Sequence, residues 1–197
     1  MLSILIWEMN RLKVAIILVV GLSILVITRA AKTALVISAL CIIHDIYNCW
    51  TSDIRQRLLL IIITLLCLSS NLALYAVYSQ EPQDVIALIV IAQISDILQY
   101  IFGKAFGHHY ISRISPNKTL EGYLGGFISL QILGYFFSLD AWKVSNIYIL
   151  GILGGIIFSA VKRNLNRKDY SNLLGTHGGW LDRTDSLYFP AWYLYFR

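Results

Sequence analysis

Long apolar runs alternate with short polar segments along this chain. Five runs have about 16 to 21 residues, close to the roughly 20 that a helix needs to cross a bilayer. These runs cover residues 12–28, 58–78, 85–103, 122–139 and 146–161. Residues 33–50 form a weaker candidate because His44 and Asp45 lie near its end, and residues 184–196 are short, aromatic and interrupted by Pro190. The pattern predicts an all-α membrane helical bundle with about six or seven transmembrane helices.

Composition supports a lipid environment. The chain is 57% hydrophobic and 14% charged, with a mean hydropathy of +0.67, and a water-soluble domain cannot hide so much apolar surface in one core. The run at 12–28 is longer than a signal-peptide core, so we expect a retained helix. No repeat or linker divides the chain. We therefore expect one structural domain, with membrane helices of low chemical content in residues 1–83 and the chemistry in residues 84–197.

Basic residues set the expected orientation. Sixteen Lys and Arg against eleven Asp and Glu give a net charge of +5, and much of the positive charge lies in two polar loops, residues 104–121 and 162–183. Because short cytoplasmic loops carry an excess of Lys and Arg, we expect both loops and the N-terminus in the cytoplasm, although Arg29 and Lys32 then fall outside. The loops would attract an anionic partner, and anionic lipid headgroups alone also account for such a charge.

Two acidic positions lie within or beside apolar runs. Asp96 is in the middle of the run at 85–103, where a carboxylate costs about 3 kcal/mol or more unless it faces a polar cavity or a cation. It is therefore a candidate functional residue, and the alternative is a structural pairing with Gln93, Ser95 or Gln99. Asp45, beside His44 near a helix end, is expected at the membrane interface rather than in a site.

The first polar loop interleaves glycines, hydroxyls and basic residues. Ser115, Lys118 and Thr119 precede Glu121 and Gly122, and such a loop can bind phosphate through backbone N–H groups and lysines. The alternative is a basic loop beside the membrane in which Ser-Pro and the glutamate start a helix. The loop alone does not decide between the two.

The second polar segment gathers many ionisable groups between glycines. Asp182 and Asp185 are three residues apart, so a helix would place both on one face, where their oxygens could bind one divalent cation. Alternatively, Asp182 is a helix N-cap and Asp185 completes a start like a capping box. That alternative leaves the neighbouring basic residues and His177 unexplained. The other members of this cluster are Ser159, Lys162, Arg163, Lys168, Asp169, Gly175, Gly178, Gly179 and Arg183.

Residues 159–185 resemble the signature of the phosphatidate cytidylyltransferase (CDP-diacylglycerol synthase) family. The order is Ser-x-x-Lys-Arg, a four-residue gap, Lys-Asp, then Gly-x-His-Gly-Gly leading into Asp-Arg-x-Asp. Residues 115–122, Ser-Pro-x-Lys-Thr-x-Glu-Gly, resemble the family's second hallmark, and Asp96 with Gln99 resembles the intramembrane element before it. The resemblance covers residues 85–196, and the chain is shorter than usual members.

The resemblance implies transfer of CMP from CTP to phosphatidic acid, giving CDP-diacylglycerol and pyrophosphate in phospholipid biosynthesis. It implies Mg²⁺ held by Asp182 and Asp185 with Asp96, and it allows a second, monovalent cation such as K⁺. Lys162 and His177 would act catalytically, the histidine either donating to pyrophosphate or orienting a carboxylate. Substrate binding would fall to Ser115, Lys118, Thr119, Ser159, Arg163, Lys168, Gly178, Gly179 and Arg183.

Other functions stay open at this point. They are a CTP-dependent lipid kinase, a CDP-ether-lipid synthase, an inactive truncated homologue and an anion transporter that uses Asp96. Against the transporter, the ionisable groups mostly lie beyond the helix ends rather than at broken helices near the midplane. The expected partners are CTP, phosphatidic acid and membrane lipids, with no nucleic acid. A homodimer and a bacterial cytoplasmic membrane are expected from the resemblance.

Overall fold

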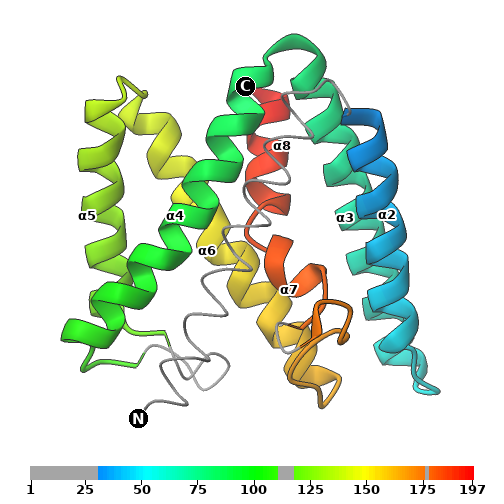
Figure 1. Cartoon of the computed structure of the whole chain (residues 1–197). Coiled ribbons are helices and arrows are strands. Elements are labelled where there is room, and N and C mark those ends of the chain that lie inside the picture. The colour runs from blue at the N-terminus through cyan, green and yellow to red at the C-terminus, as the bar shows by residue number, and fades with distance from the viewer. Residues whose placement is uncertain (1–30, 111–117, 176–177) are drawn as a thin grey trace.

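The structure is a computed structural model that describes residues 31–110, 118–175 and 178–197. Over these residues the chain forms seven helices and no strand; one isolated bridge joins Tyr110 to Thr119. The helices are α2 (Ala31–Asn48), α3 (Ile54–Gln80), α4 (Pro82–Phe106), α5 (Leu120–Phe136), α6 (Ala141–Asn164), α7 (Leu181–Thr184) and α8 (Tyr188–Phe196) (Figure 1). The predicted all-α class is confirmed, and the expected helix at 12–28 lies outside the described residues.

Three described helices are long and apolar enough to cross a membrane: α3, α4 and α6. Large apolar side chains on their outer faces and on α5 are exposed, among them Leu65, Leu72, Ile101 and Ile128. In water this much exposed apolar surface would be an aggregation hazard, whereas in a bilayer it contacts lipid. The chain is therefore a helical membrane protein.

Local sequence explains where several helices begin. Asp53 and Asp140 are the N-caps of α3 and α6, and their carboxylates accept hydrogen bonds from Arg55 N (2.9 Å) and Trp142 N (3.0 Å). Pro82 stands in the first turn of α4, where its missing N–H costs nothing. The run at 184–196 is divided between α7 and α8, with Pro190 tolerated in the first turn of α8.

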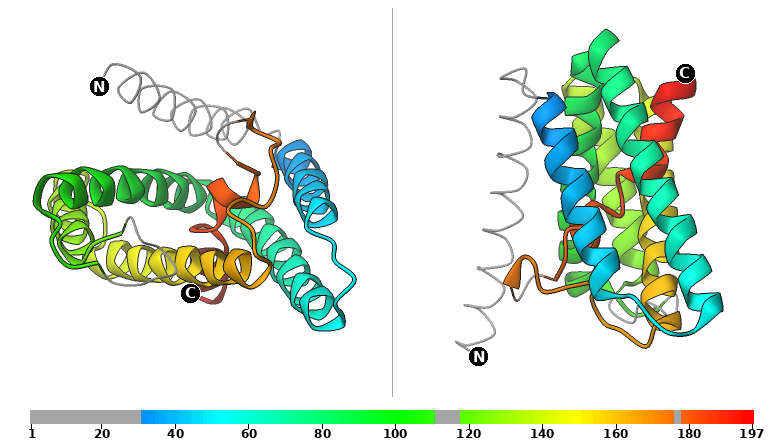
Figure 2. Two further views of the ribbon diagram at one scale, coloured as in Figure 1. Left: turned by 90° about the horizontal axis from the view of Figure 1, so that it is seen from below. Right: turned by 90° about the vertical axis from the view of Figure 1, so that its right-hand side faces the viewer.

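The helices run up and down, so the connections alternate between two ends of the bundle (Figures 1 and 2). α4 packs against α5 and α6, while α8 packs between α3 and α6. The loops after α4 and α6, which hold the two predicted polar segments, lie at the same end. The α3–α4 and α5–α6 connections lie at the opposite end, where Asp84 pairs with Lys143 and Asp140 with Arg197. The prediction that the two polar loops share a side is confirmed.

Glycines allow close helix contacts near the polar end. A Cβ on Gly122 would lie 2.6 Å from the carbonyl oxygen of Gln99, and one on Gly126 would lie 2.9 Å from the Tyr148 hydroxyl. A Cβ on Gly154 of α6 would lie 2.5 Å from the carbonyl oxygen of Asp185. These spaces bring α5 against α4 and bring the segment after α7 against α6, as small residues do in membrane bundles.

Replacing Gly126 with Leu is expected to lower the melting temperature in detergent by several degrees. The added side chain must displace Tyr148 and Gln99, and overpacking of this kind costs about 1–3 kcal/mol. Gly155→Ala is the matched control, because the nearest atom to its Cβ would be 3.9 Å away. Equal melting temperatures for Gly126→Leu and the wild type would contradict the packing account.

Candidate active site

Asp96 faces a lysine from the first polar loop. Lys118 Nζ lies 3.2 Å from Asp96 Oδ1 and 3.1 Å from Gln99 Oε1. The two charged side chains are partly exposed, at 36% for Lys118 and 46% for Asp96. Burial by itself would lower the pKa of Lys118, but the charges of Asp96, Tyr123 and Asp185 and the hydrogen bond to Asp96 together outweigh this effect and raise the pKa. The alternative pairing of Asp96 with Ser95 is wrong, because that hydroxyl donates to Ala92 O at 2.7 Å.

The start of α5 fixes Lys118 in this position. Thr119 is the N-cap, only 5% exposed, and its Oγ1 accepts from Gly122 N at 3.2 Å. Glu121 accepts from the backbone N–H groups of His108 and His109 at 3.1 and 3.2 Å. A helix does start in this loop with Glu121 in its first turn, as the alternative expected, and it presents the lysine to α4. The Ser-Pro pair of that alternative lies outside the described residues. The predicted substrate contact of Thr119 stays a prediction, with its hydroxyl used as a cap here.

Asp182 organises the second polar segment. Its Oδ1 pairs with Lys162 Nζ at 2.6 Å, and its Oδ2 accepts from Tyr170 N at 2.9 Å and Gly179 N at 2.8 Å. The pair is buried, with 11% of the lysine and 4% of the aspartate side chain exposed. The alternative reading of Asp182 as an N-cap is wrong, because Trp180 precedes α7 and Asp182 lies within it.

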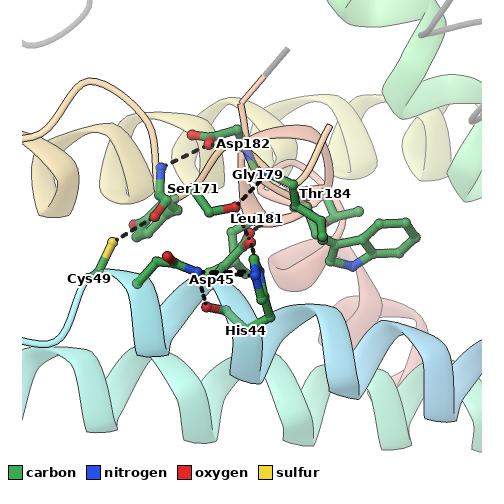
Figure 3. Close-up of polar contacts among 12 residues, drawn as sticks. His44, Asp45, Cys49, Ser171, Gly179, Leu181, Asp182 and Thr184 are labelled. Atoms are coloured by element: carbon green, nitrogen blue, oxygen red, sulfur yellow. Dashed lines mark hydrogen bonds and ion pairs between the residues drawn. The ribbon is translucent and has the colours of Figure 1, made fainter. Parts of the chain in front are cut away.

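A residue that sequence reasoning set aside holds the same segment. Asp45 on α2 is fully buried, and it accepts from Ser171 Oγ at 2.6 Å and Leu181 N at 2.8 Å (Figure 3). The expectation of an interfacial role for Asp45 is therefore wrong. Ile42, Asp45, Ile46 and Cys49 share one buried face of the helix, and this periodicity was the signal in the sequence that could have revealed it.

The backbone at Gly178 and Gly179 passes between the carboxylates of Asp182 and Asp45. Gly178 has a φ of +82°, and a Cβ on it would lie 2.8 Å from Asp182 Oδ2; a Cβ on Gly179 would collide with the Asp45 carboxylate. Only glycine fits this passage at low cost. Because the Gly179 N–H already donates to Asp182, it is not free for the phosphate contact that the sequence suggested.

Asp185 lies between the two polar elements. Its carboxylate has no hydrogen bond or ion pair within the described parts of the chain, and its backbone carbonyl packs on Gly154. The charges of Asp96, Lys162, Lys118 and Asp182 act on its carboxylate. This position, at the end of α7, makes Asp185 the point where the α4 and α6 sides of the site meet.

The residues present fit a magnesium site in which the protein supplies only one or two ligands. No three His, Cys, Asp or Glu side chains in the described portion lie close enough to hold a metal ion together. Mg²⁺, however, commonly takes only one or two carboxylates and completes its shell with water and substrate phosphates. Asp185, which has no hydrogen bond or ion pair to another described residue, and the half-exposed Asp96 meet that requirement, whereas Asp182 would first have to give up one of its donors. The predicted set of all three acids stays a prediction.

The remaining predicted residues surround this centre unevenly. Ser159 is half-buried on α6, and Lys168 is exposed in the following loop. Arg163 is exposed and donates to Arg167 O at 2.8 Å, and Arg183 is half-buried on α7. Ser115 and His177 lie outside the described residues, so their predicted roles stay predictions.

Comparison with known proteins gives a family match and several relatives. The model of the cytidylyltransferase family matches residues 3–197. Phosphatidate cytidylyltransferase of Bacillus subtilis is 41% identical over 108 residues, which are 49% of this chain and 40% of the relative. The enzyme of the same name from Aquifex aeolicus is 38% identical over 112 residues, 51% of this chain and 42% of the relative.

A third relative carries a less informative name. The Escherichia coli protein "Uncharacterized protein YnbB" is 36% identical over 117 residues, covering 54% of this chain and 39% of the relative. In all three cases the match covers about two fifths of the relative's length.

Asp182→Asn and Asp185→Asn are expected to differ in their effect on stability, because the Asp182 carboxylate forms an ion pair and hydrogen bonds within the described residues and the Asp185 carboxylate does not. The first change leaves Lys162 buried without its counter-charge, so it should lower stability by about 3 kcal/mol or more. The second removes no described hydrogen bond or ion pair and should leave the melting temperature within a few degrees of the wild type. Thermal unfolding of both variants in one detergent checks this, and equal losses would contradict the distinction.

Proposed function

The chain belongs to the cytidylyltransferase family, and from that premise we propose that it is a phosphatidate cytidylyltransferase. A phosphate oxygen of phosphatidic acid would attack the α-phosphorus of CTP. The bond from that phosphorus to the oxygen bridging the β-phosphate would break, and CDP-diacylglycerol and pyrophosphate would form. The observation that carries this proposal is the Asp185 carboxylate, which makes no hydrogen bond or ion pair with the described residues and is influenced by the charges of both the Lys118–Asp96 and the Lys162–Asp182 pairs.

The reaction needs charge neutralisation more than a strong base. A phosphate monoester is already ionised at neutral pH, while two polyanions must approach each other and pyrophosphate must leave. Lys118 reaches the site from the α5 side and is partly exposed, so it can bind an incoming phosphate. Lys162 is buried against Asp182 and lies 5.6 Å from the centroid of the Tyr170 ring. Its positive charge would act on the phosphates from a fixed position.

We place Mg²⁺ on Asp185 with Asp96, and with Asp182 if that carboxylate exchanges a donor. The ion would neutralise phosphate charge and stabilise the leaving pyrophosphate. A monovalent cation such as K⁺ beside it is part of the same proposal. Arg163, Lys168 and Arg183, which lie on α6, the following loop and α7, would supply further positive charge for the two substrates.

We also propose an orientation, a membrane and an oligomeric state for the enzyme. The bundle end with both polar loops would face the cytoplasm, in line with their excess of basic residues. The membrane would be the cytoplasmic membrane of a bacterium, and the protein would act as a homodimer.

Asp185→Asn is expected to abolish formation of CDP-lipid while the protein remains folded. The change is isosteric but discards the charge that a hard cation requires. Turnover is measured with CTP, phosphatidic acid and Mg²⁺ in detergent, alongside the melting temperature. Asp140→Asn is the matched control, because Asn also caps helices and Asp140 lies at the opposite end of the bundle. Near-normal magnesium-dependent turnover by Asp185→Asn would refute the metal assignment.

Lys118→Met should raise the KM for at least one substrate by about tenfold or more. The substitution keeps most of the side-chain volume and removes the charge that binds phosphate, at a cost of roughly 1.5–3 kcal/mol per charged hydrogen bond. Lys143→Met removes a lysine from the opposite end and should leave both KM values unchanged. Unchanged KM values for CTP and lipid in Lys118→Met would exclude the binding role.

A further inference from the structure

The C-terminal end of α2 forms a docking face for the segment between α6 and α7. Ile42, Asp45, Ile46 and Cys49 are between 0% and 6% exposed, and they recur at the spacing of one helix face. Two of the four make polar contacts with the segment, since Cys49 Sγ donates to Tyr170 O at 3.0 Å and Asp45 accepts from Ser171 and Leu181. An N-terminal helix thus contributes directly to the shape of the site.

Asp45 joins two points of the segment that are ten residues apart. One oxygen accepts from the Ser171 hydroxyl, and the other accepts from the backbone N–H of Leu181. Asp182 joins Tyr170 and Gly179, close to Ser171 and Leu181 in the sequence, because its Oδ2 accepts from both backbone N–H groups. Figure 3 shows Asp45 beneath the loop and Asp182 on its other side. The two carboxylates therefore close the loop from opposite faces, with Gly179 between them.

The Asp45 contact acts on the beginning of α7. Leu181 is the first residue of that helix, and its last residue, Thr184, directly precedes Asp185. The backbone of Asp185 itself is held against α6 by the close approach of its carbonyl group to Gly154. A shift at Leu181 would therefore be passed through one helical turn to the carboxylate that we propose as a metal ligand.

Burial of the Asp45 carboxylate destabilises the fold unless the negative charge strengthens the hydrogen bonds that it accepts. Burying a charged group is costly, and the compensation comes from charge-assisted hydrogen bonds, which are about twice as strong as neutral ones. His44 adds a weaker contact, with its Nδ1 3.6 Å from Asp45 Oδ1. The hydroxyl and amide donors each find a short, strong acceptor in Asp45, at 2.6 and 2.8 Å.

We infer that Asp45 is a positioning residue of the active site, which holds the loop between Tyr170 and Leu181 and thereby sets the place of Asp185. This role rests on the proposed function for its catalytic consequence, but the holding of the loop does not. Asp45 itself touches no reacting group in this account.

The test compares Asp45→Asn with Ile42→Ala. Ile42 lies on the same face and is fully buried, so its truncation leaves a cavity and lowers stability while the Asp45 contacts remain. Hydrogen–deuterium exchange of residues 170–184 and the kinetic constants for CTP are measured at temperatures well below both melting points. We expect Asp45→Asn to speed exchange in this segment and to lower kcat on the order of tenfold or more with little change in KM. Ile42→Ala should do neither at a similar loss of melting temperature.

Asp45→Asn behaving like Ile42→Ala in both measurements would overturn the inference. Should Asp45→Asn fail to fold, Ser171→Ala removes one of the two donors and keeps the other. Local faster exchange in Ser171→Ala then supports the role, and unchanged exchange overturns it. If the wild type makes no CDP-lipid, the exchange data alone decide. Acceleration confined to residues 170–184 in Asp45→Asn would keep the holding role while the proposed function fails.

Discussion

The arrangement of the site depends on how the two buried ends of a non-helical segment are held against the helices. Tyr170 and Ser171 at one end and residues 178–181 at the other are buried, and a backbone N–H group left unpaired there would cost several kcal/mol. Two carboxylates supply the missing acceptors. Asp182 takes the N–H groups of Tyr170 and Gly179, and Asp45 takes that of Leu181. The loop can enter the bundle because these acceptors are present.

Charge balance then assigns different tasks to the acids. Lys162 neutralises Asp182 in a buried pair, and Lys118 neutralises Asp96 in a more exposed one. A buried pair is a poor site for an incoming cation, because its Coulomb attraction must be broken first. Asp185 has no such partner in the described residues. Asp185 is therefore the carboxylate that a metal can reach without breaking an ion pair seen in the described residues, and the lysines stay in place for phosphates.

The sequence predicted the helices well because lipid imposes a simple rule of length and hydropathy. The runs at 58–78, 85–103 and 146–161 lie within α3, α4 and α6, and the two polar loops share one end as their charge indicated. The family signature likewise includes Lys162 and Asp182, which form a buried ion pair. The hydrogen-bond and ion-pair partners of each residue were harder to predict, because the spacing of residues along the sequence does not reveal which distant residues come into contact. Lys118 meets Asp96 over 22 positions, and Asp45 meets Leu181 over 136.

The most direct test of the central claim follows the α- and γ-phosphates of CTP separately. Purified protein in detergent is incubated with phosphatidic acid and Mg²⁺, using CTP labelled in one phosphate or the other, with EDTA as the control. The account predicts a lipid product labelled only from the α-phosphate, with the γ-label released in pyrophosphate, and no product with EDTA. Label passing from the γ-phosphate to lipid, or no labelled lipid from either CTP, would contradict it.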